Sequence, residues 1–168
     1  LLPPDAALDP LLRQVGVRPL SQAAVLHVPG AAAATPDTPL QAHITARRPL
    51  IERLRQAEPA PGRATGQLDF LDRLQVRRLP GLQTVYRLAL GDTMVTTRPE
   101  PAAARLETAT ATLYVAEGPP SWPAIARELA LAIRPDRSAG GLALGLREVL
   151  AAPTPAAATR LLDELGYP

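Results

Sequence analysis

One stretch decides the fold, Thr112-Leu113-Tyr114-Val115-Ala116-Glu117-Gly118-Pro119-Pro120-Ser121-Trp122. Its first part is apolar and β-branched or aromatic, which is typical of a strand. The glycine and the two prolines end that strand, and Ser121 is a residue type that favours the N-cap of a helix. The stretch therefore predicts a strand followed directly by a helix, and it separates a β-rich part of the chain from a helical C-terminal part.

Three segments after this stretch carry apolar residues at helical spacing. The first spans 122–133 and stops before Pro135, because the residue preceding a proline is pushed out of the helical conformation. The second spans 138–150, and the third begins at Thr154-Pro155, a cap followed by a proline in the first turn. These segments predict a C-terminal three-helix cluster within residues 117–168.

Before the stretch, the hydrophobic period changes from helical to two. Residues 76–90 and 93–97 alternate between apolar and polar side chains on either side of Gly91-Asp92, a turn dipeptide that favours a hairpin. A further alternating segment, rich in threonine, covers 106–115. The pattern predicts an antiparallel meander of about three to five strands over residues 76–116.

Proline and glycine divide the N-terminal half into short elements. The pattern predicts helices over 9–17, 38–56 (bent before Pro49) and 67–74, a strand over 25–28 and a flexible loop over 29–38. The expected fold class is therefore α+β, with short N-terminal helices, a central antiparallel sheet and the C-terminal helical cluster.

The length fits one domain over residues 1–168. We expect its parts to be an N-terminal subsegment (1–28), the loop (29–38), helices followed by the meander (39–116) and the helical cluster (117–168). Because the chain begins with Leu1, we expect it to be a fragment of a larger protein.

Composition excludes several kinds of chemistry. All 18 basic residues are arginine, and the chain has no Lys, Asn or Cys. A P-loop ATPase and Schiff-base catalysis need a lysine, whereas disulfides and thiolate metal sites need cysteine. We expect no bound cofactor. No segment approaches the ~18 apolar residues of a membrane span, so we expect a cytoplasmic location and no membrane contact.

The candidate catalytic residues all have simpler structural explanations. His27 and His43 lack a second ligand at metal-binding spacing. Ser21, Ser121 and Ser138 do not lie in a G-x-S-x-G elbow, and the last two fit helix caps better. Asp69 and Asp72 share a helix face, as paired acids in catalysis can, but a solvated face explains them as well. Gly140-Gly141 and Gly145 fall inside a helical pattern, which favours close helix packing over a phosphate loop.

The densest basic groups form the candidate nucleic-acid-binding site, which consists of Arg47, Arg48, Arg53, Arg55, Arg77 and Arg78. Arginines gathered on one surface can contact phosphates. Two observations oppose this interpretation. Aromatic residues that could stack on bases are scarce near these arginines, with only Phe70 and Tyr86 available. The chain also has 16 acidic residues, which leave a net charge of +2. An arginine-rich composition imposed by GC-rich coding explains the same counts.

Several segments resemble a region of the sacsin-like and NO VEIN-like large proteins, which carry an N-terminal GHKL-type (histidine-kinase-like) ATPase domain. The segments are Val15-Gly16-Val17-Arg18-Pro19-Leu20-Ser21, Leu113-Tyr114-Val115 with the following turn, Trp122-Pro123-Ala124-Ile125-Ala126-Arg127-Glu128-Leu129-Ala130, Arg147-Glu148-Val149-Leu150, and Leu161-Leu162-Asp163-Glu164-Leu165-Gly166-Tyr167-Pro168. These matches are loose and consist mainly of hydrophobic spacing.

The resemblance implies a module of a chaperone-like or nucleic-acid-defence machine. The GHKL site needs an asparagine for Mg²⁺ and ATP, and this chain has none, so no catalytic residue is carried over. We therefore expect a non-catalytic structural or interaction module, whose partners are other domains of the same or another protein. The alternative is an arginine-mediated nucleic-acid-binding domain.

Overall fold

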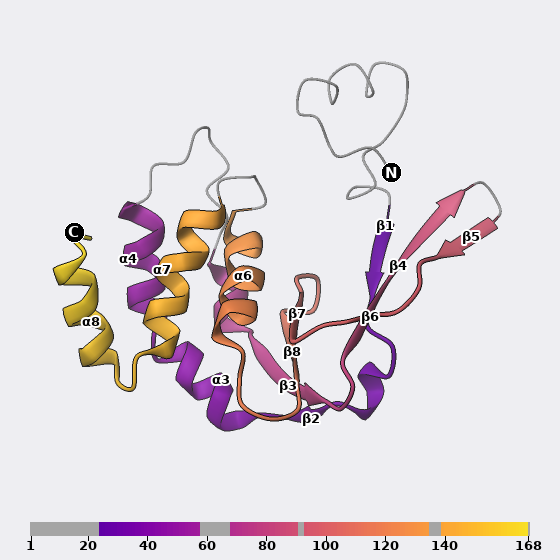
Figure 1. Cartoon of the computed structure of the whole chain (residues 1–168), viewed down its shortest axis with the longest axis horizontal. Coiled ribbons are helices and arrows are strands. Elements are labelled where there is room, and N and C mark those ends of the chain that lie inside the picture. Colours follow the sequence, from indigo (N-terminus) through magenta and orange to yellow (C-terminus); the bar gives the residue numbers. More distant parts are fainter. Residues whose placement is uncertain (1–23, 58–67, 91–92, 135–138, 168) are drawn as a thin grey trace, which may run out of the picture. The chain divides into compact units, whose positions relative to one another are not determined.

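The computed structural model describes residues 24–57, 68–90, 93–134 and 139–167, which contain both helices and strands (Figure 1). The predicted α+β class is confirmed. The chain divides into two compact units, and we describe each by itself. The first unit consists of Leu1–Pro29 and Gln83–Glu100, and the second consists of Gly30–Leu82 and Pro101–Pro168.

The first unit contains a small antiparallel sheet. Strand β4 (Gln83–Leu90) pairs with β1 (Ala24–His27) on one side and with β5 (Thr93–Thr96) on the other. A two-residue strand, β6 (Glu100–Pro101), also pairs with β4. The predicted strand near 25–28 and the antiparallel pairing of the segments before and after residues 91 and 92 are therefore confirmed. The predicted turn at those two residues lies outside the described residues.

The second unit contains a second sheet with the strand order β2-β3-β8-β7. Its strands are β2 (Thr35–Pro36), β3 (Gln75–Leu79), β7 (Ala104–Glu107) and β8 (Thr112–Ala116). β3 and β8 run parallel, and the other two pairs are antiparallel. The predicted single antiparallel meander is therefore wrong, since residues 76–116 contribute to two sheets and one pairing is parallel. Alternation shows which residues share a face of a strand, but it does not show which strand pairs with which.

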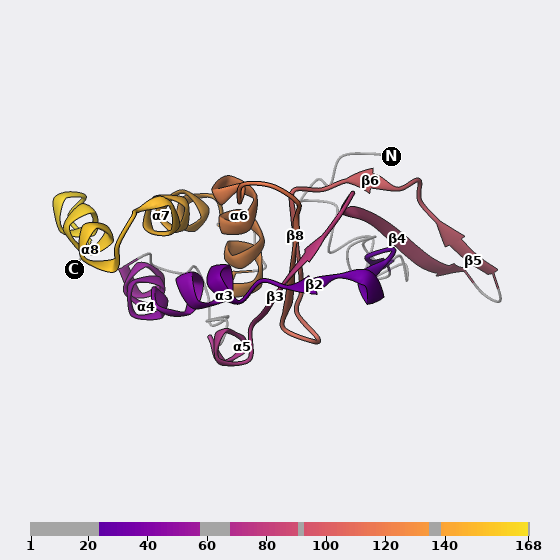
Figure 2. The same ribbon diagram turned by 90° about the horizontal axis from the view of Figure 1, so that it is seen from below.

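Six helices are described, all in the second unit (Figures 1 and 2). They are α3 (Thr38–Thr45), α4 (Arg48–Ala57), α5 (Asp69–Asp72), α6 (Trp122–Ile133), α7 (Ala139–Ala151) and α8 (Pro155–Glu164). α7 packs against α6, α8 and α4, and α6 also covers β7. The three C-terminal helices are confirmed, although the predicted start at Ser138 and the stop at Pro135 lie outside the described residues.

The core of this unit is built from leucine, isoleucine, valine and alanine. Ile51, Leu54, Leu113, Leu129 and Leu146 are all less than 2% exposed. Because aromatic residues are only 3% of the chain, these aliphatic side chains supply the hydrophobic stabilisation, about 1.5–3 kcal/mol for each one that is fully buried.

The segment 29–38, predicted as a flexible loop, is instead tied into the sheet. It contains a 3-10 turn, η1 (Ala31–Ala33), and strand β2. Asp37 is 8% exposed; its N–H donates to the Val76 carbonyl at 2.8 Å, and its carboxylate accepts from Leu40 N at the start of α3. The loop prediction is wrong because a proline- and alanine-rich composition does not reveal a buried carboxylate that joins a helix to a strand.

The other N-terminal elements are partly as predicted. The segment 38–56, expected as one bent helix, forms two helices, α3 and α4. The N-cap of α3 is Asp37 instead of the expected Thr38. The helix expected over 67–74 is limited to α5. The helix expected over 9–17 lies outside the described residues, and the single-domain organisation stays a prediction. No helix in the described part of the chain is long and apolar enough to cross a membrane.

Candidate functional site

The most polar buried site lies where the end of α3 meets the C-terminal end of α7. Arg47 Nε donates to the Val149 carbonyl at 3.0 Å, and Nη2 donates to the Ala152 carbonyl at 2.5 Å. His43 Nε2 donates to the Leu150 carbonyl at 2.8 Å. We call His43 and Arg47 the α7 clamp, because together they bind three carbonyls that end or follow α7.

The α7 clamp supplies hydrogen-bond donors to carbonyls at the C-terminal end of α7. The last four carbonyls of a helix have no partner inside it, and they carry the negative end of the helix dipole. Arg47 is only 2% exposed, and this burial lowers the pKa of its guanidinium. The cation is compensated by the carbonyls of Val149, Ala152 and His43, the last at 3.0 Å from Nη1. Arg47 therefore holds helices together through its guanidinium, and its role in nucleic-acid binding stays a prediction.

His43 has a second structural contact. Its ring stacks on Trp122 of α6, with ring centroids 4.9 Å apart and planes at 19°. A histidine that donates to a carbonyl and stacks on an indole is committed to packing. Within the described ranges, no group of three or more His, Cys, Asp or Glu residues could hold a metal ion.

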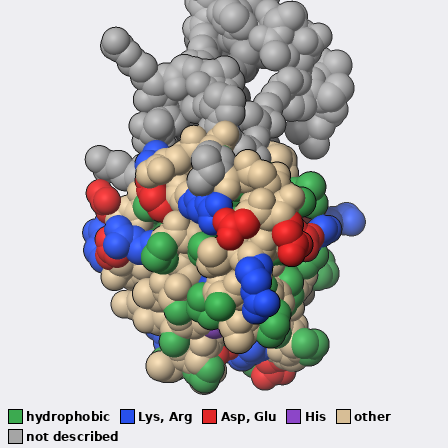
Figure 3. All heavy atoms as spheres, turned by 90° about the vertical axis from the view of Figure 1, so that its left-hand side faces the viewer, with side chains coloured by type: hydrophobic (Ala, Val, Ile, Leu, Met, Phe, Trp, Pro, Cys, Tyr) green, Lys and Arg blue, Asp and Glu red, His purple; other side chains and the backbone are tan. Residues whose placement is uncertain are grey.

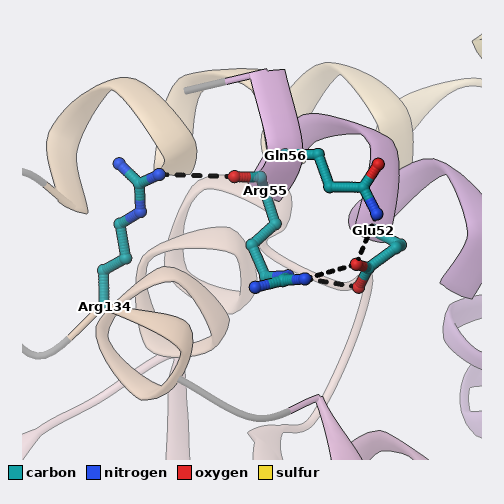
Figure 4. Close-up of polar contacts among 4 residues, drawn as sticks. All are labelled: Glu52, Arg55, Gln56 and Arg134. Carbon is teal, nitrogen blue, oxygen red and sulfur yellow. Dashed lines mark hydrogen bonds and ion pairs between the residues drawn. The ribbon is translucent and has the colours of Figure 1, made fainter. Parts of the chain in front are cut away.

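A second polar network lies near the C-terminal ends of α4 and α6 (Figure 4). Arg55 donates to both carboxylate oxygens of Glu52, and Gln56 Nε2 donates to the same carboxylate at 2.8 Å. The hydrogen bonds from Arg55 lower the pKa of Glu52 and raise the pKa of Arg55. Arg134, which is 4% exposed, donates from Nη2 to the Arg55 carbonyl at 3.3 Å. This network again uses a cation at the end of a helix.

The remaining candidate arginines also bind groups inside the second unit. Arg48 pairs with Asp72 at 3.0 Å, and Arg53 Nη2 contacts Asp163 at 2.6 Å and the Tyr167 carbonyl. The β3 arginines bind the carbonyls and carboxylates of neighbouring segments. The partners are the Ala34 carbonyl for Arg77, and Asp37 and the Ala116 and Gly118 carbonyls for Arg78.

The six candidate arginines therefore lie in one unit but do not form a free cationic surface. Four of them lie at or on α4 and two on β3, and each has an internal hydrogen-bond or ion-pair partner. On the face shown in Figure 3, acidic and basic side chains lie beside one another, with apolar side chains between them. Asp69 and Asp72 are both exposed on α5, and Asp72 forms an ion pair with Arg48.

Other arginines have no such partner. Within the described ranges, five guanidinium groups make no hydrogen bond or ion pair, namely those of Arg73, Arg87, Arg98, Arg127 and Arg160. None of the five belongs to the candidate nucleic-acid-binding site, and all except Arg73 lie apart from the densest arginine groups of the sequence. The arginines of the dense groups instead lie at helix ends or on a strand, where they donate to carbonyls and carboxylates of neighbouring segments.

The described part of the first unit exposes apolar side chains on its hairpin. Tyr86 of β4 is 38% exposed, and Met94 and Val95 of β5 are 60% and 45% exposed. Tyr86 was expected only as a possible stacking residue, and no sequence pattern indicates a role for Met94 or Val95. Tyr86 and Val95 lie on one face of this hairpin and Met94 lies on the other, and exposed apolar side chains of this kind can be covered by another protein.

Comparisons of the chain with protein-family models, with curated proteins and with solved structures found no match.

Proposed function

We propose that this chain is a non-catalytic interaction module of a larger, multidomain protein. The observation that carries the proposal is the β4–β5 hairpin, which exposes Tyr86, Met94 and Val95 to solvent. Exposed apolar side chains cost free energy in a monomer, and their burial against a partner recovers about 25 cal/mol for each Å² of apolar surface.

The use of polar groups in the second unit supports the same function. A catalytic centre needs polar groups that are positioned but not consumed by the fold. The α7 clamp and the Glu52–Arg55 network are instead committed to helix ends and to each other. These contacts stabilise the helical body of the second unit.

The context of the module is inferred from the sequence resemblance described above. A place beside a GHKL-type ATPase, in a sacsin-like or NO VEIN-like protein, would give the module a chaperone-like or nucleic-acid-defence setting. Nucleic-acid binding by the module itself has less support, because the internal partners of Arg53, Arg55, Arg77 and Arg78 compete with phosphate.

The absence of cysteine allows a direct test. A single Thr96→Cys variant places one thiol on the exposed hairpin, and Arg127→Cys places one on exposed α6 as the matched control. Each thiol is labelled with a photo-cross-linker, and each labelled chain is mixed with the purified remainder of the protein that contains it. We expect cross-links to a defined partner segment from position 96 and few from position 127. Equal yields at the two positions would contradict the proposal.

A further inference from the structure

The two edges of the second sheet are both blocked against further strand pairing. The β2 edge carries Pro36, which has no N–H to donate. At the other edge, the N–H of Leu106 on β7 donates to a carboxylate oxygen of Glu128 from α6 at 3.0 Å. Proline and side chains that cover backbone groups are common protections of sheet edges.

The outer edge of β5 in the first sheet has no such protection. β5 ends the strand order β1-β4-β5, and no described segment pairs with its outer side. Thr97 N donates to the Tyr86 carbonyl at 2.9 Å, and hydrogen-bonded pairs alternate along an antiparallel ladder. The backbone N–H and C=O groups of Met94 and Thr96 therefore point away from β4. β5 itself contains neither proline nor a charged residue.

The two faces of the hairpin differ in chemistry. Tyr86 and Val95 lie on one face, because Leu88 pairs with Val95 and Tyr86 is two residues before Leu88. The other face carries Arg87, which pairs with Thr96, and Met94, which pairs with Ala89. Arg98 follows the end of β5 by two residues.

Basic side chains outnumber acidic ones among the described residues of this unit. Arg87 and Arg98 are exposed, and within the described residues neither guanidinium has a partner. Glu100 is the one acidic residue among the described residues of this unit. An added strand would lie about 4.8 Å from β5 and about 10 Å from β4, a distance that the long side chain of Arg87 and a glutamate on the added strand can span together.

We propose that the outer edge of β5 binds an extended segment of a partner protein in which acidic and apolar residues alternate. The segment adds one strand to the sheet through the backbone groups of Met94 and Thr96, with its acids beside Arg87 and Arg98 and its apolar side chains beside Val95. This inference rests on the proposed interaction function and names the chemistry of the partner.

The probe is a synthetic, fluorescently labelled peptide of about eight alternating Glu and Val residues, a usual strand length. Its binding to the whole chain is measured by fluorescence anisotropy. Two control peptides separate the contributions: one has Lys in place of Glu, and one carries N-methyl groups on alternate backbone amides. We expect both controls to bind at least about tenfold more weakly, because the first reverses the charge and the second removes the strand donors. Equal binding of the N-methylated peptide would overturn strand addition.

Three variants locate the binding site. Met94→Pro removes an outward N–H and leaves the pairing with β4 intact, so we expect at least a roughly tenfold loss of affinity with an unchanged circular dichroism spectrum. Arg87→Ser combined with Arg98→Ser should reduce the preference for Glu over Lys. Arg127→Ser, which removes an exposed cation from the second unit, is the control and should bind normally. Unchanged binding by Met94→Pro would contradict the proposal.

The outcomes also distinguish this inference from the proposed function. Position-96 cross-links without binding of the Glu–Val peptide would overturn strand addition and leave the interaction function intact. If neither position-96 cross-links nor binding of the Glu–Val peptide is observed, the interaction function and strand addition are both contradicted. A dimer in light scattering that Met94→Pro abolishes would show that a second copy occupies the edge, which would also overturn the acidic-partner proposal.

Discussion

Arg47 is the residue whose environment departs most from that of an ordinary surface arginine. Its guanidinium contacts three carbonyls, on segments separated by more than 100 residues in the case of Val149 and Ala152. Replacing it leaves buried acceptors at the end of α7 without donors, and each such loss costs free energy.

We predict that Arg47→Ala lowers the free energy of unfolding by about 3 kcal/mol, measured by urea denaturation. Arg47→Lys should recover little of it, because an ammonium cannot supply the planar set of donors. The neighbouring Arg48→Ala is the matched control: its ion pair with Asp72 is exposed, so we expect a change below about 1 kcal/mol. Equal effects at the two positions would refute the structural role of Arg47.

Glu52 should make folding stability depend on pH. Its folded pKa is lowered by the hydrogen bonds from Arg55, so its stabilising contribution is present above the unfolded pKa of about 4.3 and is lost as pH falls through the folded value. We predict that Glu52→Gln is less stable than the parent chain at pH 7 by under about 1 kcal/mol, because the pair is partly exposed.

The difference should shrink as pH falls below the unfolded pKa of about 4.3, measured by thermal unfolding. Glu164→Gln, which changes an exposed carboxylate on α8, is the control. A difference between Glu52→Gln and the parent chain that stays constant with pH would contradict the assignment.

At the scale of elements, the starts of α6 and α8 provide a matched pair of helix caps. The Thr154 side chain accepts a hydrogen bond from Ala157 N at 3.1 Å, whereas Ser121, the N-cap of α6, makes no side-chain capping bond. We predict that Thr154→Ala lowers the free energy of unfolding by about 1 kcal/mol. Ser121→Ala should cost clearly less. The comparison is made by chemical denaturation, and a larger cost at Ser121 would be inconsistent with these caps.

The packing of α7 on α4 depends on Gly145. A Cβ at this position would lie 2.8 Å from Leu54 Cδ2, and Leu54 is fully buried. We predict that Gly145→Ala destabilises the chain by about 1–3 kcal/mol, because Leu54 must repack.

Gly140, also in α7, has open space around an added Cβ. Gly140→Ala should therefore stabilise the chain by about 0.5–1 kcal/mol through its higher helix propensity. Melting temperatures of the two variants should move in opposite directions, and shifts of the same sign would contradict the packing argument.

At the scale of the whole molecule, the distribution of charge bears on nucleic-acid binding. The net charge is +2, and the densest arginines are bound to carbonyls and carboxylates. We predict weak binding to duplex and single-stranded DNA, measured by fluorescence anisotropy at about 50 and 200 mM salt, with little change between them. Tight binding with a steep salt dependence would support the nucleic-acid alternative.

Helices were the most predictable elements of this protein. The apolar stripe and the following proline placed α6, and Thr154-Pro155 placed the start of α8, because these signals act within a few residues. The same logic failed at Asp37, whose capping role depends on contacts with α3 and with Arg78 of β3. Its partners on β3 are about 40 residues away along the chain, a separation that no local pattern can report.

The sequence alone therefore determined the α+β class, the helical C-terminus and the absence of lysine, asparagine and cysteine side chains. These properties follow from composition and from the local period of apolar residues. The tertiary structure alone decided which strands pair, and whether each arginine faces solvent or a helix end. Both depend on contacts between distant segments: β3 aligns parallel with β8, and Arg53 of α4 reaches Asp163 of α8 across 110 residues.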